Sequence, residues 1–309
     1  MPAIPRPHGP RAIGARPAAF RRTRLLIVGC GDVGCRVLRR LPASVRVLAL
    51  TSSTERLQSL RAAGAVPLLG DLDAPHTLRR LAGWATRVLH LAPPPTSTAS
   101  DDPRTRNLLR ALRRSELPTA LVYGSTSGVY GDCAGAAVSE TRTANPATPR
   151  ARRRVDAERS VRALGCATRM RVTILRIPGI YAQDRPNGTP RERLLKRTPA
   201  LAPDIDVYTN HIHADDLARA CTLALWRGAP QRTVNVSDCS DLRMGEYFDL
   251  AADLYGLPRA PRINADAAMQ QLSPMQRSFM SESRRLSNQR MKCELRLVLR
   301  YPTVLDGLR

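Results

Sequence analysis

The sequence is short of lysine, of aromatic residues and of long apolar runs. Only Lys196 and Lys292 among its 49 basic residues are lysine, so arginine carries almost all of the net charge of +23. No apolar run reaches the roughly 18 residues of a membrane-spanning helix, which predicts a soluble protein with no membrane partner. Aromatic residues make up 4% of the chain, too few for base-stacking platforms. Nucleic acid is therefore not an expected partner, although the charge would permit it.

The cysteine spacing gives no indication of a metal site. The seven cysteines include no Cys-x-x-Cys pair, so we expect no metal site. Their odd number in a long chain is more typical of a reducing cytoplasm than of a disulfide scaffold, which predicts a cytoplasmic protein. His211 and His213 lack a third ligand, and we interpret them as packing residues before a helix capped by Asp215 or Asp216.

The first residues differ in composition from the rest. Residues 1–24 hold five prolines, six arginines and no acid. Such a segment has little apolar surface to offset the entropy of ordering, so residues 1–23 are predicted to be a disordered basic tail. A transit peptide, or a start codon assigned too far upstream, would explain the composition as well.

From Leu25 onward, apolar strands alternate with helices. Strands are predicted at residues 25–28, 45–50, 66–69, 87–92, 119–125 and 171–177, with helices between them. This alternation is typical of an α/β fold with a parallel, doubly wound sheet of the Rossmann type. The pattern weakens after Pro178. We therefore expect residues 24–178 to form the sheet domain and 179–309 a small C-terminal substrate-side lobe, with a late strand and helices interleaved with the sheet domain.

A glycine fingerprint follows the first strand directly and opens the next helix. Gly29 permits a tight turn, Gly31 lets the backbone approach a pyrophosphate, and Gly34 lets helix and strand pack closely. The helix N-terminus adds free N–H groups and a positive dipole end for phosphates. A glycine-rich turn without a ligand is the alternative. The predicted dinucleotide-binding loop comprises Gly29, Cys30, Gly31, Asp32, Val33 and Gly34.

The end of the second strand bears on the choice of dinucleotide. NAD-binding chains usually carry an acid there for the ribose 2′-hydroxyl, whereas this chain has Thr51 or Ser52 at that place. These hydroxyls could bond a 2′-phosphate and Arg56 could neutralise it, so NADP is favoured over NAD. Glu55 is the alternative acid, and a simple helix cap at Ser53 or Thr54 fits either dinucleotide.

Later motifs appear in a fixed order: Gly70-Asp71-Leu72, His90-Leu91-Ala92, residues 124–131 (GSTSGVYG), residues 145–149 (NPATP), residues 177–181 (IPGIY), residues 211–218 (HIHADDLA) and Asn235-Val236-Ser237. Over about Arg24–Leu225 the chain resembles the extended short-chain dehydrogenase/reductase family, the NAD-dependent epimerase/dehydratase group. The resemblance implies that the cofactor site extends beyond the glycine loop. The further residues that it places there are Asp71, Leu72, Leu91, Ala92, Pro178 and Ile180.

The catalytic helix departs from the family pattern of Tyr-x-x-x-Lys. The flanking prolines and Glu158 fix the register, which puts Arg150 at the tyrosine position and Arg154 at the lysine position. Arginine is not deprotonated in proteins, so Arg150 cannot serve as general base. Arg154 could still bond ribose hydroxyls. Thr126 matches the family's catalytic Ser/Thr, and the chain resembles the atypical members of the family.

These residues imply an NAD(P)-dependent oxidoreductase or epimerase-like enzyme acting on an unidentified small molecule. If Arg150 and Arg154 bind it, that substrate is anionic. Tyr130, Tyr181 or a water held by Thr126 would then be the proton donor. The competing interpretation is a protein that binds or senses NAD(P) without catalysis. As partners we expect the substrate and, at most, a second copy of the chain in a homodimer.

Overall fold

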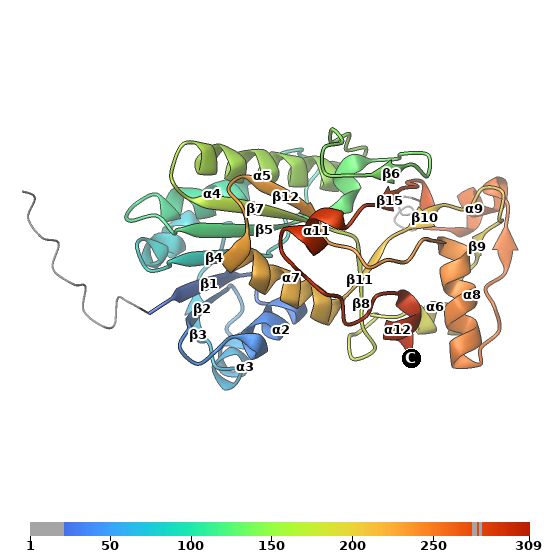
Figure 1. Ribbon diagram of the computed structural model, residues 1–309, viewed down its shortest axis with the longest axis horizontal. Helices are drawn as coiled ribbons and strands as arrows, with labels where there is room; N and C mark the ends of the chain where they lie inside the picture. Colours follow the sequence, from blue (N-terminus) through green and yellow to red (C-terminus); the bar gives the residue numbers. More distant parts are fainter. Residues whose placement is uncertain (1–21, 274–276, 278–279) are drawn as a thin grey trace, which may run out of the picture.

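The computed structural model describes residues 22–273, 277 and 280–309 (Figure 1). Residues 1–21, and with them nearly all of the predicted basic tail, lie outside the described residues. No helix in the described part of the chain is long and apolar enough to cross a membrane.

Within these residues, seven parallel strands form the central sheet in the order β12-β7-β5-β4-β1-β2-β3. The six strands expected from the apolar runs are present, and the α/β, doubly wound prediction is confirmed. The strands are β1 (Arg24–Val28), β2 (Arg46–Thr51), β3 (Val66–Leu69), β4 (Arg87–His90), β5 (Ala120–Thr126), β7 (Arg171–Ile177) and β12 (Arg232–Asn235).

Helices cover both faces of the sheet (Figure 1). Alternate side chains of β1 explain why, because successive residues of a strand point to opposite faces. Leu25 and Ile27 join one apolar core, while Leu26 and Val28 join the other. The first core is covered by α2 (Asp32–Arg40), α3 (Arg56–Ala62) and α7 (Ala214–Arg227), and the second by η1 (Pro75–Leu81), α4 (Pro103–Leu112) and α5 (Pro149–Cys166).

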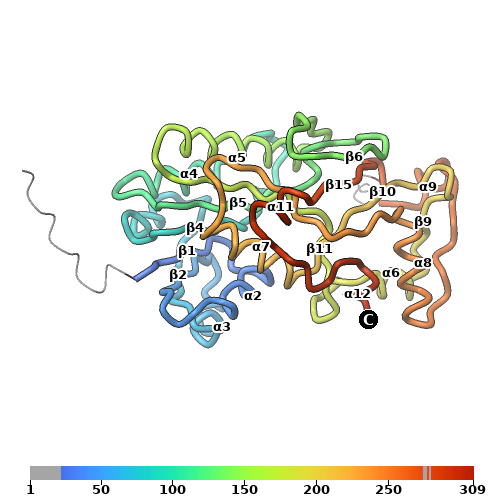
Figure 2. The backbone as a smooth tube through the Cα atoms, in the orientation of Figure 1, coloured from blue at the N-terminus to red at the C-terminus, as the bar shows by residue number. Residues whose placement is uncertain are grey.

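The C-terminal part of the chain builds a lobe and also returns to the sheet. The lobe core surrounds Tyr181, Tyr247 and Phe248, whereas Met291 of α11 packs in the core of the sheet domain. Figure 2 shows the last segment running from α11 beside the sheet back to α12 in the lobe. The helices here are α6 (Arg191–Leu195), α8 (Met244–Tyr255), α9 (Ala265–Gln271), α11 (Gln289–Cys293) and α12 (Val304–Leu308).

Short strands pair in the loops at the carboxyl edge of the sheet. The pairs are β8 (Gly179–Tyr181) with β11 (His211–His213), β9 (Ala200–Leu201) with β14 (Arg262–Ile263), β10 (Tyr208–Thr209) with β13 (Leu242–Arg243), and β6 (Ala137–Val138) with β15 (Arg285–Leu286). The charge pattern of residues 284–296 predicts one charged helix face, and this prediction is wrong. These residues form β15 and the short α11 instead, because Arg284 and Arg290 are tied to Glu282 and Glu294 rather than to solvent.

Candidate functional site

The glycine loop leaves little room for a side chain at Gly29 and Gly34, whereas Gly31 faces open space. Gly29 has a φ of +84°, and a Cβ there would lie 2.4 Å from the Ala92 nitrogen. A Cβ on Gly34 would meet the Gly29 carbonyl oxygen and the Cys30 sulfur at 3.3 Å. At Gly31 no atom lies within 4 Å of the Cβ position. The loop thus presents a bare backbone face at the start of α2, which is the space a pyrophosphate needs.

The segment after β4 lies directly beside this loop. The backbone N–H groups of Leu91 and Ala92 both donate to the Val28 carbonyl, at 2.8 and 3.0 Å. Leu72 is buried in the sheet core, and Asp71 accepts a bond from the Asp73 N–H at 2.9 Å. The remaining predicted contacts, Pro178 and Ile180, follow β7 at the same carboxyl edge of the sheet.

Arg56 and Thr51 have different environments. The Arg56 guanidinium donates to the Cys30 carbonyl at 2.6 Å, so its charge lies against the glycine loop. The Thr51 hydroxyl is buried and accepts a bond from the Ser53 N–H at 3.2 Å. The Arg56 cation is therefore available at the glycine loop, while the Thr51 hydroxyl already bonds its own turn.

Arg36 on α2 is a buried cation that the sequence interpretation missed. It is 5% exposed and pairs with Asp32 at 3.1 Å, Asp215 at 2.6 Å and Asp184 at 2.5 Å. Asp32 also lies 3.2 Å from Arg185. Both cations pair with Asp32 and so offset its negative charge at the start of α2. They also tie the glycine-loop helix to the loop after β8 and to the start of α7.

Thr126 ends β5, and Arg154 bonds residues of the same strand. The Thr126 hydroxyl accepts a bond from the Gly128 N–H at 3.3 Å and caps the short helix η2 (Ser127–Tyr130). Arg154 on α5 donates to the Gly124 carbonyl at 2.6 Å and to the Tyr123 hydroxyl at 3.2 Å. Arg150 lies one helical turn before Arg154, on the same side of α5. Desolvation, and then the charges of Arg154 and Arg153, lower the pKa of Arg150.

A carboxylate from the C-terminal part of the chain, that of Glu282, also lies near Gly128 and Arg150. The negative charge of Glu282 raises the pKa of Arg150, against the effect of desolvation. The Oε2 atom of Glu282 lies 3.8 Å from the position that a Cβ on Gly128 would take. Arg284 holds it at 2.8 Å and also donates to the Gly131 carbonyl at 2.8 Å. No local sequence signal could have found Glu282, because only the fold brings it to α5.

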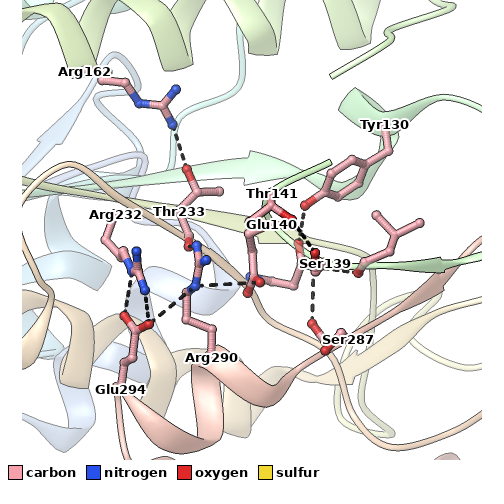
Figure 3. A network of polar contacts seen from close by, with 12 residues as sticks. Tyr130, Ser139, Glu140, Thr141, Arg162, Arg232, Thr233, Ser287, Arg290 and Glu294 are labelled. Atoms are coloured by element: carbon pink, nitrogen blue, oxygen red, sulfur yellow. Dashed lines mark hydrogen bonds and ion pairs between the residues drawn. The ribbon is translucent and has the colours of Figure 1, made fainter. Parts of the chain in front are cut away.

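Beneath the site lies a buried polar network. Glu158 accepts from the Ser125 hydroxyl at 2.6 Å and pairs with Arg176 at 2.8 Å. The Arg176 guanidinium stacks 4.6 Å from the centre of the Tyr130 ring, whose hydroxyl donates to Asn235 at 2.8 Å. Figure 3 shows Tyr130 pointing into the polar cluster that continues this network around Glu140 and Arg290.

Neither alternative tyrosine is placed as a proton donor. Tyr130 and Tyr181 are 1% and 2% exposed, and burial raises the pKa of both. The Tyr181 hydroxyl donates to the Thr303 carbonyl at 3.1 Å, and that of Tyr130 is bonded to Asn235. We interpret both as packing residues.

The two histidines pack inside the lobe. The expected cap at Asp215 or Asp216 was wrong, because His213 caps α7 by accepting from the Asp215 N–H at 3.2 Å. Asp216 instead accepts from the backbone N–H groups of residues 300 and 301. His211 stacks on Tyr247 with ring centres 4.1 Å apart, and burial lowers its pKa to about 3. Over residues 22–273, 277 and 280–309, no group of three or more His, Cys, Asp or Glu could hold a metal ion.

Comparison with known families agrees with the ordered motifs of the sequence. The model of the NAD dependent epimerase/dehydratase family matches residues 25–237. The chain belongs to this family. The resemblance drawn from the motifs is thus confirmed, although no curated protein sequence matches the chain.

Solved structures of the same architecture match nearly the full length of the chain. A functionally unknown conserved protein from Silicibacter pomeroyi DSS is 30% identical, with a TM-score of 0.76 over 93% of this chain and 96% of that one. UDP-glucuronic acid 4-epimerase from Bacillus cereus is 20% identical, with a TM-score of 0.74 over 93% and 96%. UDP-glucose 4-epimerase from Thermotoga maritima is 18% identical, with a TM-score of 0.74 over the same shares. The two epimerases support the fold alone.

Proposed function

We propose that this protein binds a nicotinamide dinucleotide on its glycine loop and acts on a small anionic molecule as an oxidoreductase or epimerase-like enzyme. The open face at Gly31 carries the proposal, because a backbone without a side chain at a helix N-terminus suits a pyrophosphate. Arg36 supports it by neutralising Asp32. The structure of the Bacillus cereus epimerase is a complex with NAD, and the family membership extends that expectation to this chain.

The residues at the carboxyl end of β5 suit the handling of a substrate. When bound, the dinucleotide would supply a hydride acceptor or donor. Thr126 would orient a substrate oxygen, and Arg150 would bind a carboxylate or phosphate. Since Arg150 cannot exchange a proton, Glu282 is the carboxylate that could take or return one, at Oε2. UDP-glucuronic acid, named for the Bacillus cereus structure, is a suitable anionic test molecule.

A second candidate function is dinucleotide binding or sensing without catalysis. The arginine at the tyrosine position favours it, because the family's proton relay is missing there. Turnover of reduced dinucleotide over a panel of carbonyl compounds and nucleotide sugars separates the two functions. Tight dinucleotide binding with no turnover on any of them would favour the sensing protein.

Gly31→Ala is expected to weaken dinucleotide binding about tenfold or more, which is about 1.4 kcal/mol. The added methyl would occupy the space proposed for the pyrophosphate, whereas no protein atom lies within 4 Å of it. The fold should therefore survive, as circular dichroism can verify. Fluorescence titration with NADPH measures the effect, and unchanged affinity in the folded variant would remove the glycine loop as the site. Gly34→Ala should weaken binding as well, by pushing α2 from β1.

NADP is expected to bind more tightly than NAD, and Arg56→Ala should remove the difference. A charge-assisted bond to the 2′-phosphate is worth about 1.5–3 kcal/mol, or roughly ten- to a hundredfold in affinity. Calorimetry with both dinucleotides measures it. Arg61→Ala, an exposed arginine in the same helix, is the matched control. Equal loss of NAD and NADP in Arg56→Ala would argue for a purely structural bond to the Cys30 carbonyl.

Arg150→Ala is expected to lower turnover of an anionic substrate at least tenfold, about 1.4 kcal/mol, with dinucleotide affinity unchanged. UDP-glucuronic acid and UDP-glucose form the test pair, because they differ in one carboxylate. Arg152→Ala, on the exposed side of α5, is the control. If the two variants behave alike, Arg150 is a surface arginine without a functional role.

A further inference from the structure

A cysteine and a lysine that take no part in the site described above are in contact with each other. Lys292 of α11 directs its amine nitrogen Nζ to the Cys239 sulfur at 3.2 Å. Cys239 follows β12 and is exposed to solvent. Lysine is scarce in this chain, where 47 of the 49 basic residues are arginine. One of its two lysine amines is thus in contact with a free thiol.

The backbone holds both partners in position. The Cys239 N–H donates to the Pro302 carbonyl at 2.7 Å. Asn288, just before α11, donates to the Ser237 and Asp238 carbonyls at 2.9 Å each, and its amide lies 3.7 Å from the Cys239 sulfur. These bonds join α11 to the loop after β12, so the amine and the sulfur meet without any large movement. Fixed reacting groups behave as if they were at very high local concentration.

We propose that Cys239 and Lys292 form an oxidative modification site, at which a peroxide converts their contact into a covalent bond between Sγ and Nζ. In the first step hydrogen peroxide transfers one oxygen to the thiol, giving a sulfenic acid and water. In the second, the lone pair of the uncharged amine attacks sulfur, the S–O bond breaks, and the leaving hydroxide takes an amine proton to form water. Overall one S–H and one N–H bond are lost, one S–N bond forms, and the peroxide is reduced to two waters.

The lysine is essential to this chemistry. An arginine at 292 would keep the positive charge, but its guanidinium stays protonated and offers no free amine. The bond would link two residues that lie 53 positions apart in the sequence. It would also attach α11, which packs on β12 (Figure 1), to the loop that follows that strand. A covalent link of this kind restricts the unfolded chain, as a disulfide does. The site does not depend on the function proposed above.

The experiment treats the full-length protein with hydrogen peroxide and maps its peptides by mass spectrometry. We expect a linked pair of peptides that contain Cys239 and Lys292, lighter by two hydrogens than their sum, and a raised thermal midpoint. Lys292→Arg and Cys239→Ser should abolish the link. Lys196→Arg and Cys166→Ser should not, because these residues lie at the ends of α6 and α5.

Three results would overturn the proposal. Recovery of Cys239 solely as sulfinic or sulfonic acid would show that the amine does not capture the sulfenic acid. A two-hydrogen loss that persists in Lys292→Arg and vanishes in Cys293→Ser would identify a disulfide with the neighbouring exposed cysteine. A linked pair that retains one oxygen would rule out the direct S–N bond.

Discussion

Glu158→Ala is expected to destabilise the protein by about 3–5 kcal/mol, the usual loss when one partner of a buried ion pair is removed. Glu158 is 3% exposed and Arg176 is 5% exposed. Without the carboxylate, the Arg176 guanidinium stays buried beside Tyr130 with its charge uncompensated, and the Ser125 hydroxyl loses its acceptor. The loss should be far larger than for an ion pair at the surface.

Urea unfolding monitored by circular dichroism measures the free energy of unfolding of each variant. Asp253→Ala is the matched control, since it removes the exposed ion pair with Arg259, which spans 2.7 Å. Glu158→Gln is informative too, because it retains an acceptor oxygen but leaves the Arg176 charge uncompensated. If Glu158→Ala lost no more stability than Asp253→Ala, the buried pair would not hold α5 to β7.

Much of the fold could be predicted because its signals are local. Each of the six predicted strands is a run of apolar residues between turn residues, and burial on both faces of a parallel sheet requires such runs. The glycine loop was found for the same reason, since Gly29, Gly31 and Gly34 act through their own backbone. The expected helix over residues 284–296 failed because charge spacing alone does not reveal that Arg284 and Arg290 have fixed carboxylate partners.

The site could be predicted only in part. Thr126, Arg150 and Arg154 could be proposed because the family motifs supply their register, and because the carboxyl ends of parallel strands share one edge; their catalytic roles stay a prediction. Arg36 and Glu282 were missed because their roles depend on partners distant in sequence, such as Asp184 and Arg150. In the sequence, Glu158 helps to align the helix with the family pattern. Its pairing with Arg176 could not be predicted, because it depends on how α5 packs on β7.

Raising the pH through 7 is expected to destabilise the folded protein, and Asp238 is the cause. This residue is 4% exposed, and burial raises its pKa to about 7 from an ordinary value of 3.8, with the charge of Asp216 adding to the effect. The bond from the Ser240 N–H, at 2.9 Å, acts in the opposite direction. The folded state therefore binds the Asp238 proton more tightly than the unfolded state does.

The sign of the effect follows from proton linkage. The stabilising contribution of the protonated carboxyl is complete below pH 4 and falls as the pH rises towards 7. One pKa unit corresponds to 1.36 kcal/mol, so the full loss is on the order of 4 kcal/mol. Asp238→Asn keeps the shape without the charge, and should make the free energy of unfolding at pH 8 higher than in the parent protein. Unfolding curves between pH 5 and pH 8 measure this difference. Parallel pH dependence in the parent protein and the variant would show that Asp238 folds in its charged form.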